Sequence, residues 1–123
     1  MRTVLVVDDE FGVAEVIEAI LEDEGYRVLT AVNGRQGLAR LAENRPDLVL
    51  LDMMMPIVDG PAMLKAMKAD PQFADIPVVM MSSLDPRSVD AECTGYAAFL
   101  RKPFRAAAVT DLVARLIGPS PKD

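Results

Sequence analysis

The sequence contains no histidine, no tryptophan and only one cysteine, Cys93. The lack of histidine excludes a phosphohistidine donor, a histidine general base and a histidine-ligated metal site within this chain. A single cysteine cannot form an intrachain disulfide or a cysteine metal cluster. Cys93 lies between Glu92 and Thr94 and has no histidine to act as its base, so we interpret it as a structural or incidental thiol.

Signals for membranes, export and nucleic acid are also missing. No apolar run reaches the roughly eighteen residues of a membrane span, and Met1-Arg2-Thr3 leads into strand-like sequence without a signal-peptide cleavage site. The formal net charge of −6, from 13 basic and 19 acidic residues, argues against the clustered basic stripe that nucleic-acid binding needs. We therefore expect a cytoplasmic protein with no membrane contact and no direct contact with nucleic acid.

What the sequence does contain is enough apolar side chains for one compact core. Its 123 residues are 51% hydrophobic, which supports a globular domain and argues against disorder. Gly118-Pro119 ends the last helical pattern of the chain. We expect one domain over residues 1–118 and a flexible C-terminal tail over residues 119–123.

Four apolar runs end at polar residues, and these ends carry the functional signal. The runs are Val4-Leu5-Val6-Val7 before Asp8-Asp9, Leu48-Val49-Leu50-Leu51 before Asp52, residues 76–81 before Ser82-Ser83, and residues 97–100 before Arg101-Lys102-Pro103. Continuous runs of this length suit strands of a parallel sheet that is buried on both faces. Because ligands bind outside the carboxyl ends of such strands, we expect three Asp, one Ser and one Lys to meet at one edge of one sheet. This set is typical of a magnesium-dependent phosphoryl-transfer site.

The rest of the chain alternates between strand and helix patterns. We predict strands over residues 3–8, 27–31, 47–52, 76–82 and 97–100, and helices over residues 11–24, 35–44, 62–69, 86–94 and 105–117. The first helix has an apolar stripe formed by Val13, Val16, Ile17, Ile20 and Leu21. The helix over residues 86–94 is the weakest, because Val89 and Ala91 are its only clear apolar anchors. The alternation predicts an α/β fold with a doubly wound, five-stranded parallel sheet and right-handed crossovers.

The strand-end residues also stand in an order that points to one family. Asp8-Asp9, Asp52, Ser82 and Lys102-Pro103 follow one another at strand ends, with Met55-Pro56 and Asp59-Gly60 after Asp52. On these motifs the whole chain resembles a response-regulator receiver domain of two-component signalling. The resemblance implies a flavodoxin-like (βα)5 fold with strand order 2-1-3-4-5, and a signalling switch rather than a turnover enzyme.

The resemblance implies roles for the acidic residues. Asp52 is expected to accept a phosphoryl group from a histidine kinase phosphohistidine, as a nucleophilic carboxylate can. The reaction brings negative charges together, so it needs a cation. By resemblance, Mg²⁺ or Mn²⁺ is held by Asp9, Asp52 and the backbone carbonyl of Met54, with Asp8 acting through water. Since the three carboxylates repel one another, we expect Mg²⁺ to raise the melting temperature.

Four further positions take their roles from the same resemblance. Lys102 is expected to place its ammonium against the phosphoryl oxygens, and its peptide bond to Pro103 is expected to be cis. Ser82 is expected to donate its hydroxyl to the phosphorylated Asp52. Phe99 is the expected switch residue, and because it has no hydroxyl it must act through packing alone.

The resemblance also implies partners and a phosphoryl lifetime. The expected partners are a sensor histidine kinase or phosphotransfer protein and a downstream protein target, and the chain is expected to be a monomer or a weak phosphorylation-dependent dimer. In receiver domains the lifetime depends partly on the residues two after the acceptor Asp and two after the Ser, here Met54 and Leu84. Both are apolar and cannot orient an attacking water, so we expect slow self-dephosphorylation.

Taken singly, these residues have simpler interpretations. Asp8 and Asp9 precede a helix and could cap it, as Ser82 could cap the helix that follows it. Lys102 alone would be a solvated charge. Asp52 fits such an interpretation least, because an Asp that ends a buried strand needs a partner.

Three other functions are left open by the residues. A magnesium-dependent aspartyl-phosphate phosphatase of the haloacid-dehalogenase type carries an Asp where this chain has Met54. A flavin-binding protein of related topology has a phosphate loop where this chain has Asp8-Asp9-Glu10. A receiver-like interaction module that is not phosphorylated would have no need of the complete set of acidic, Ser and Lys residues.

Overall fold

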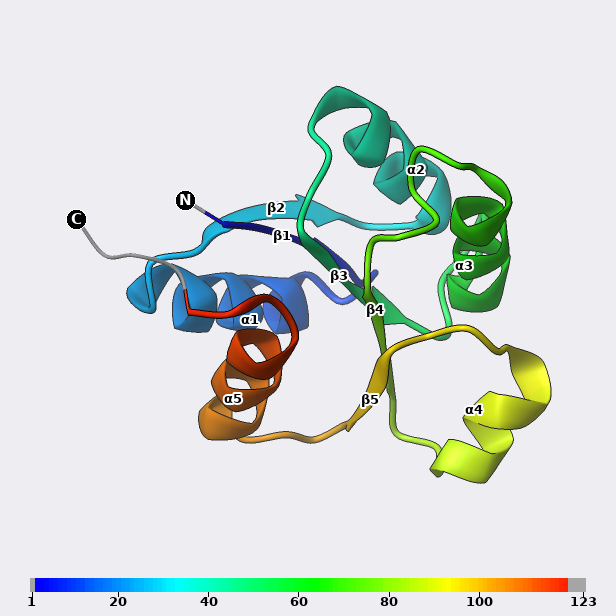
Figure 1. The fold of residues 1–123 in the computed structure, drawn as a ribbon. Helices are drawn as coiled ribbons and strands as arrows, with labels where there is room; N and C mark the ends of the chain where they lie inside the picture. The colour runs from blue at the N-terminus through cyan, green and yellow to red at the C-terminus, as the bar shows by residue number, and fades with distance from the viewer. Residues whose placement is uncertain (1, 120–123) are drawn as a thin grey trace.

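The computed structural model describes residues 2–119 and consists of a parallel sheet between two layers of helices (Figure 1). The elements in chain order are β1 (Thr3–Val7), α1 (Phe11–Asp23), β2 (Arg27–Ala31), α2 (Gly34–Glu43), β3 (Leu48–Asp52), α3 (Gly60–Ala69), β4 (Val78–Ser82), α4 (Pro86–Glu92), β5 (Ala98–Arg101) and α5 (Ala106–Ile117). The strand order is β2-β1-β3-β4-β5 and all neighbouring strands are parallel. The predicted sheet and its order are confirmed. Residues 120–123 of the predicted tail lie outside the described residues.

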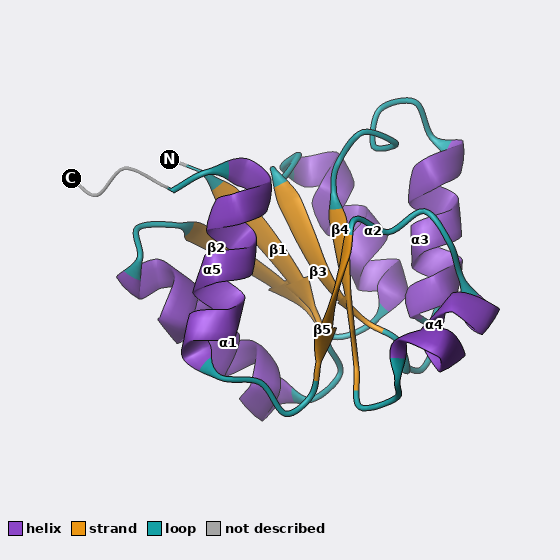
Figure 2. Cartoon of the chain, turned by 60° about the horizontal axis from the view of Figure 1, so that its bottom comes forward, coloured by secondary structure: helices purple, strands orange, loops and turns teal. Residues whose placement is uncertain are grey.

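Side chains of the central strands alternate between two cores. Val4 and Val6 of β1 pack with α1 and α5, whereas Leu5 and Val7 pack with α2 and α3. Figure 2 shows α1 and α5 on one side of the sheet and α2, α3 and α4 on the other. Both faces of the central strands are therefore buried, which is why their sequences are continuous apolar runs rather than alternating ones.

The loop between β3 and α3 is held by two close backbone approaches. The amide of Gly34 donates to the carbonyl of Val58 at 2.9 Å, and that of Gly60 donates to the carbonyl of Met53 at 3.1 Å. A Cβ on Gly60 would lie 2.2 Å from the carbonyl oxygen of Asp52, and one on Gly34 would lie 2.4 Å from that of Val58. Only glycine fits at these two positions, and together they fix the chain directly after Asp52.

Two details of the predicted helices are wrong. Val16 is exposed although the apolar stripe of the first helix placed it in the core. The weakest predicted helix forms as α4, but it covers seven residues, ends at Glu92 and buries Val89 alone, while Ala91 is exposed. One buried anchor supports little helix, since helices in proteins depend on packing of an apolar face. Within residues 2–119, none of the helices combines the length and apolar character that a membrane crossing requires.

Candidate metal and phosphoryl-transfer site

Three carboxylates gather at the carboxyl edge of the sheet, as the strand ends predicted. Asp8 and Asp9 follow β1, and Asp52 is the last residue of β3. One oxygen from each lies within 4.8 Å of the others. Ser82 ends β4 and Lys102 follows β5, so four neighbouring strands contribute to one edge. Carboxylates this close repel one another unless a cation lies among them.

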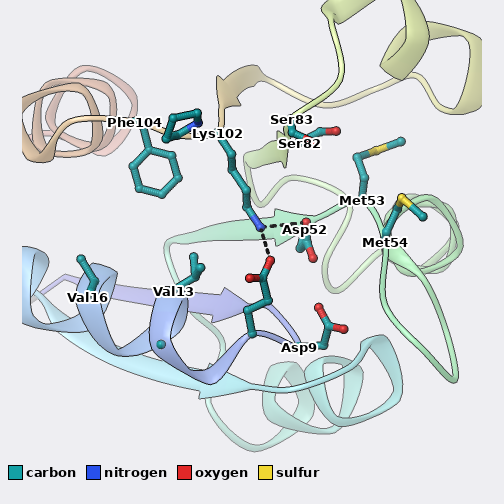
Figure 3. Close-up of a pocket in the computed structure, with 13 residues that line it drawn as sticks. Asp9, Val13, Val16, Asp52, Met53, Met54, Ser82, Ser83, Lys102 and Phe104 are labelled. Atoms are coloured by element: carbon teal, nitrogen blue, oxygen red, sulfur yellow. Dashed lines mark hydrogen bonds and ion pairs between the residues drawn. The ribbon is translucent and has the colours of Figure 1, made fainter.

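Lys102 supplies one such cation. Its Nζ donates to Oδ2 of Asp8 at 2.8 Å and to Oδ1 of Asp52 at 3.2 Å, and the latter contact is drawn in Figure 3. Glu10 is a more distant partner at 3.7 Å. The Lys102 side chain is 15% exposed, so the interpretation as a solvated charge is wrong. Burial opposes the ammonium charge, but the hydrogen bond to Asp8 and the nearby carboxylates outweigh it and raise the pKa of Lys102.

The two acidic residues after β1 have different surroundings. Asp8 is fully buried, with Oδ1 accepting from the amide of Glu10 at 2.9 Å and Oδ2 accepting from Lys102. Asp9 is exposed and faces the cleft. Glu10 is the residue at the N-cap of α1, and no side chain caps that helix. The capping interpretation of Asp8 and Asp9 is therefore wrong.

The surroundings of Asp52 disfavour its ionised form. Burial and then the charge of Asp8 raise its pKa, while Lys102 lowers it, and the result is a rise from 3.8 to about 6. One ammonium therefore does not fully offset the loss of water and the repulsion between carboxylates. A further cation close to Asp52 would favour its charged form.

The donor set fits a hard divalent cation. Mg²⁺ prefers oxygen ligands and usually takes one or two carboxylates while keeping several waters. Asp9 is exposed and its carboxylate is open to an ion, and Asp52 lies on the wall of the same cleft. Asp8 already uses both of its oxygens in hydrogen bonds, which suits a more distant role through water.

Ser82, another predicted site residue, lines the same cleft as Asp52. Ser82 is buried, and its Oγ accepts from the amide of Leu84 at 3.0 Å, so Leu84 rather than a helix end is its partner. Asp85 caps α4 through the amide of Ser88 at 2.9 Å. The capping interpretation of Ser82 is therefore wrong. The hydroxyl proton of Ser82 can still donate to an incoming oxygen.

Phe99 and the peptide bond after Lys102 complete the predicted set. The Lys102–Pro103 bond is cis, as the resemblance implied. Phe99 lies on β5 beside Met80 of β4 and packs, half-buried, against the core on the α2 and α3 side. It does not line the cleft that holds Asp52. Coupling between the two is therefore indirect, and both β4, through Met80, and β5, through Lys102, connect Phe99 to the cleft.

A cleft of about 770 Å³ extends from the carboxylates to an apolar wall that the sequence reasoning missed. Val13 and Val16 of α1 and Phe104 after β5 form this wall (Figure 3). The sequence carried no clear signal for this wall, because Val13 and Val16 belong to the same ordinary apolar stripe as the buried residues of α1. The arrangement leaves room beside Asp52 for a group much larger than a metal ion.

Comparisons with known proteins agree with this geometry. A family model described as the response regulator receiver domain matches residues 4–114. The phosphate regulon transcriptional regulatory protein PhoB of Pseudomonas aeruginosa is 35% identical over 117 residues, which cover 94% of this chain and 50% of that protein. The DNA-binding dual master transcriptional regulator RpaA of Synechocystis sp. is 34% identical over 118 residues, covering 94% and 48%. The chain spans about half the length of these relatives.

A solved structure of similar fold contains a metal. The receiver domain of a sensor histidine kinase from Pseudomonas aeruginosa, with a magnesium ion coordinated in its active-site cleft, matches with a TM-score of 0.88 at 28% identity. The match covers 95% of this chain and 98% of that domain. The transcriptional and DNA-binding roles in the relatives' names do not support the expectation of no direct contact with nucleic acid.

Proposed function

Because the chain belongs to the response-regulator receiver domain family of two-component signalling, we propose that Asp52 is the residue on which it accepts a phosphoryl group. Members of this family act as signalling switches, and membership does not favour the phosphatase, the flavin protein or the unphosphorylated module. The observation that carries the proposal is the position of Asp52, which ends β3 beside two other carboxylates and 3.2 Å from the Lys102 ammonium.

The proposed reaction is transfer from a phosphohistidine of a sensor kinase or a phosphotransfer protein. An oxygen of the Asp52 carboxylate attacks phosphorus, the P–N bond breaks, and the imidazole leaves with its electron pair and takes a proton. With a pKa of about 6, Asp52 is ionised at neutral pH and available as a nucleophile. The product is an acyl phosphate on a buried strand end, and the protein works as a switch rather than through turnover.

Asp9, Asp52 and the backbone carbonyl of Met54 are the proposed ligands of Mg²⁺ or Mn²⁺, and Asp8 contributes through water. When bound, such an ion supplies positive charge that offsets repulsion between the carboxylate and the incoming phosphoryl oxygens. The exposure of Asp9 and the full hydrogen bonding of Asp8 support this division of roles.

Lys102 is proposed to stabilise the transferred group. Its ammonium already lies among the carboxylates and its pKa is raised, so it stays charged throughout the reaction. A fixed cation at the place where negative charge arrives requires no rearrangement at the moment of transfer. Phosphorylation of Asp52 gives this ammonium new oxygen partners.

Ser82 and Phe99 are proposed to carry the signal away from Asp52. The Ser82 hydroxyl donates to a phosphoryl oxygen, which draws in the segment after β4, while its oxygen already accepts from the amide of Leu84 in that segment. Phe99 lies beside Met80 on the neighbouring strand, so a shift of β4 changes the space it fills. A downstream protein must bind the two states differently for this change to act as a signal.

The domain over residues 1–118, a cytoplasmic location and a monomer or weak dimer stay predictions. The proposal concerns the receiver domain, and the relatives' roles in transcription do not support the expectation of no direct contact with nucleic acid.

The experiment that tests the proposal locates the phosphoryl group. The protein is incubated with Mg²⁺ and phosphoramidate, whose P–N bond matches that of phosphohistidine, then reduced with borohydride and analysed by peptide mass. We expect the reduced acyl phosphate at Asp52 alone. Asp111→Asn, a change at an exposed residue of α5, should load normally as the matched control. Modification at Asp9 or Ser82, or none in the folded protein, would contradict the proposal.

A further inference from the structure

We propose that Met54 is a selective oxidation site, and that its conversion to the sulfoxide shortens the lifetime of the phosphoryl group on Asp52. The first part depends only on the exposure of the sulfur. The second part rests on the proposed function of Asp52.

The methionines of this chain differ sharply in exposure. Met54 is 73% exposed, whereas the other methionines in residues 2–119 are at most 9% exposed; they are Met53, Met55, Met63, Met67, Met80 and Met81. Oxidation of methionine sulfur requires contact with a dissolved oxidant and therefore follows exposure. Met54 is the position at which a dilute oxidant meets a methionine on the surface of the described chain.

The single thiol is less exposed than the Met54 side chain. Cys93 is half-buried at the end of α4, and burial raises its pKa. Fewer thiolates are present at a given pH, and the thiolate is the form that reacts with peroxides. The Met54 sulfur is therefore a more accessible target for the oxidant than the Cys93 thiol.

Met54 lies where a change in polarity would act on Asp52. It is two residues beyond Asp52 and lines the same cleft, and in the view of Figure 3 the Asp52 carboxylate lies between Lys102 and Met54. It also lines a smaller hollow together with Asp9. Water that approaches a phosphoryl group on Asp52 from this side passes the Met54 side chain.

The modification needs only a peroxide as oxidant. A lone pair of the Met54 sulfur attacks one oxygen of hydrogen peroxide, the S–O bond forms as the O–O bond breaks, and the departing oxygen leaves as water after proton transfer. The sulfide is oxidised to the sulfoxide and the peroxide is reduced to water. Methionine sulfoxide reductases reverse the change, so the site can act as a switch.

The sulfoxide alters how water is held at the rim of the cleft. A thioether is a weak hydrogen-bond acceptor, and Met54 therefore offers little to a water that would attack phosphorus. The sulfoxide oxygen is a strong acceptor that can orient such a water. One added hydrogen bond in the transition state corresponds to about a fivefold faster loss of the phosphoryl group.

The test measures the oxidation map and the phosphoryl lifetime on the same samples. The full chain is treated with dilute hydrogen peroxide and the excess is removed. Peptide masses then give the extent of oxidation at each methionine. A second portion is loaded with phosphoramidate and Mg²⁺, and loss of the phosphoryl group is followed by intact mass. We expect oxidation at Met54 well ahead of Met53 and Met55, and a lifetime about fivefold shorter than in untreated protein.

Two controls tie the effect to Met54. Treatment with methionine sulfoxide reductases should restore the original lifetime. In Met54→Leu, the peroxide-treated protein should lose the phosphoryl group at the same rate as the untreated protein of the same variant. A matched change at the buried neighbour, Met55→Leu, should leave the response to peroxide intact.

The outcomes separate this proposal from the proposed function. Equal oxidation of Met53, Met54 and Met55 overturns the selective site. An unchanged lifetime in protein oxidised at Met54 overturns the regulatory effect. If untreated protein does not load at Asp52, the proposed function fails and the lifetime effect fails with it, while the peptide masses still decide whether Met54 is oxidised selectively.

Discussion

The carboxylate of Asp52 is held where its charge is disfavoured, and this has a measurable consequence. Its pKa in the folded protein is about 6, above the ordinary 3.8, because of burial and the charge of Asp8. A raised carboxyl pKa means that the folded state binds the proton more tightly than the unfolded state. The ionised group therefore lowers stability above about pH 6, and this penalty disappears as the pH falls towards 4.

We predict that Asp52→Asn stabilises the metal-free protein. At about pH 8 in the presence of a chelator, the free energy of unfolding should rise by about 1–3 kcal/mol, because the neutral amide avoids the penalty that the pKa shift represents. The gain should shrink to nothing near pH 4. Urea unfolding at several pH values measures it, with Asp111→Asn on exposed α5 expected to change stability by less than about 0.5 kcal/mol. A variant that is less stable than wild type at about pH 8 would contradict the electrostatic account.

We also predict that the Met54 side chain sets the phosphoryl lifetime. Met54→Asn introduces a side chain that can orient water beside Asp52, and the acyl phosphate should decay about fivefold faster than in wild type. The measurement is loss of the phosphoryl group after removal of the donor. Val32→Asn makes the same kind of change at another exposed apolar residue and should leave the lifetime as it is. Equal decay in wild type and Met54→Asn would show that Met54 does not shield the group.

At the scale of elements, the site depends on the start of α3. The amide of Gly60 donates back to Met53, and the residue leaves no room for a Cβ beside the carbonyl of Asp52. Asp59 caps the same helix through the amide of Ala62 at 2.9 Å. These contacts fix the segment after Asp52 from both ends, so a change at the helix start should reach the site.

We predict opposite effects for two glycine substitutions. Gly60→Ala should lower the free energy of unfolding by about 2–3 kcal/mol, because the new Cβ would meet backbone at 2.2 Å. Gly12→Ala in α1 has nothing within 4 Å of the new Cβ, and should raise stability by about 0.5–1 kcal/mol. Urea unfolding of both variants is the measurement. Equal effects would contradict the steric account of the β3–α3 loop.

The elements that the sequence predicted well are those with a periodic or continuous apolar pattern. The polar residues at the edge of the sheet, Asp8, Asp52 and Ser82, were located because each follows an apolar run that is buried on both faces. The short α4 was harder, because one buried anchor, Val89, leaves almost no pattern. The helix caps at Asp59 and Asp85 were not predicted, and neither were the partners of the charged residues.

The contacts within the site illustrate the limit of sequence reasoning. Lys102 and Asp8 are 94 residues apart, and nothing local distinguishes a buried, paired lysine from a solvated one. The resemblance supplied that role and the fold supplied the geometry. The apolar wall with Val16 was missed because a helical stripe does not reveal which of its members faces a cleft.

At the scale of the whole molecule, four strand ends meet at the site, so a bound cation should stabilise the entire fold. The chain carries a net charge of −6, and three of its acidic side chains lie together at this edge. A ligand that binds only the folded state stabilises it by mass action. We therefore expect Mg²⁺ to act on global unfolding rather than on one loop.

We predict a rise in melting temperature with Mg²⁺. At a concentration about one hundred times Kd the stabilisation is about 2.7 kcal/mol, which corresponds to a rise on the order of 10 °C for a domain of this size. Thermal unfolding followed by circular dichroism measures it. Asp9→Asn should remove most of the rise, and Asp111→Asn should preserve it. A melting temperature that does not change with Mg²⁺ would count against the metal site.

The central claim is that Asp52 accepts a phosphoryl group in a metal-dependent reaction. The most direct measurement is the intact mass of wild type and Asp52→Asn after incubation with a small-molecule phosphodonor, with Mg²⁺ or with a chelator. The account predicts the gain of one phosphoryl group in wild type with Mg²⁺ and no gain in the other three samples. A folded wild-type protein that binds Mg²⁺ but gains no phosphoryl group, or an Asp52→Asn variant that gains one, would contradict it.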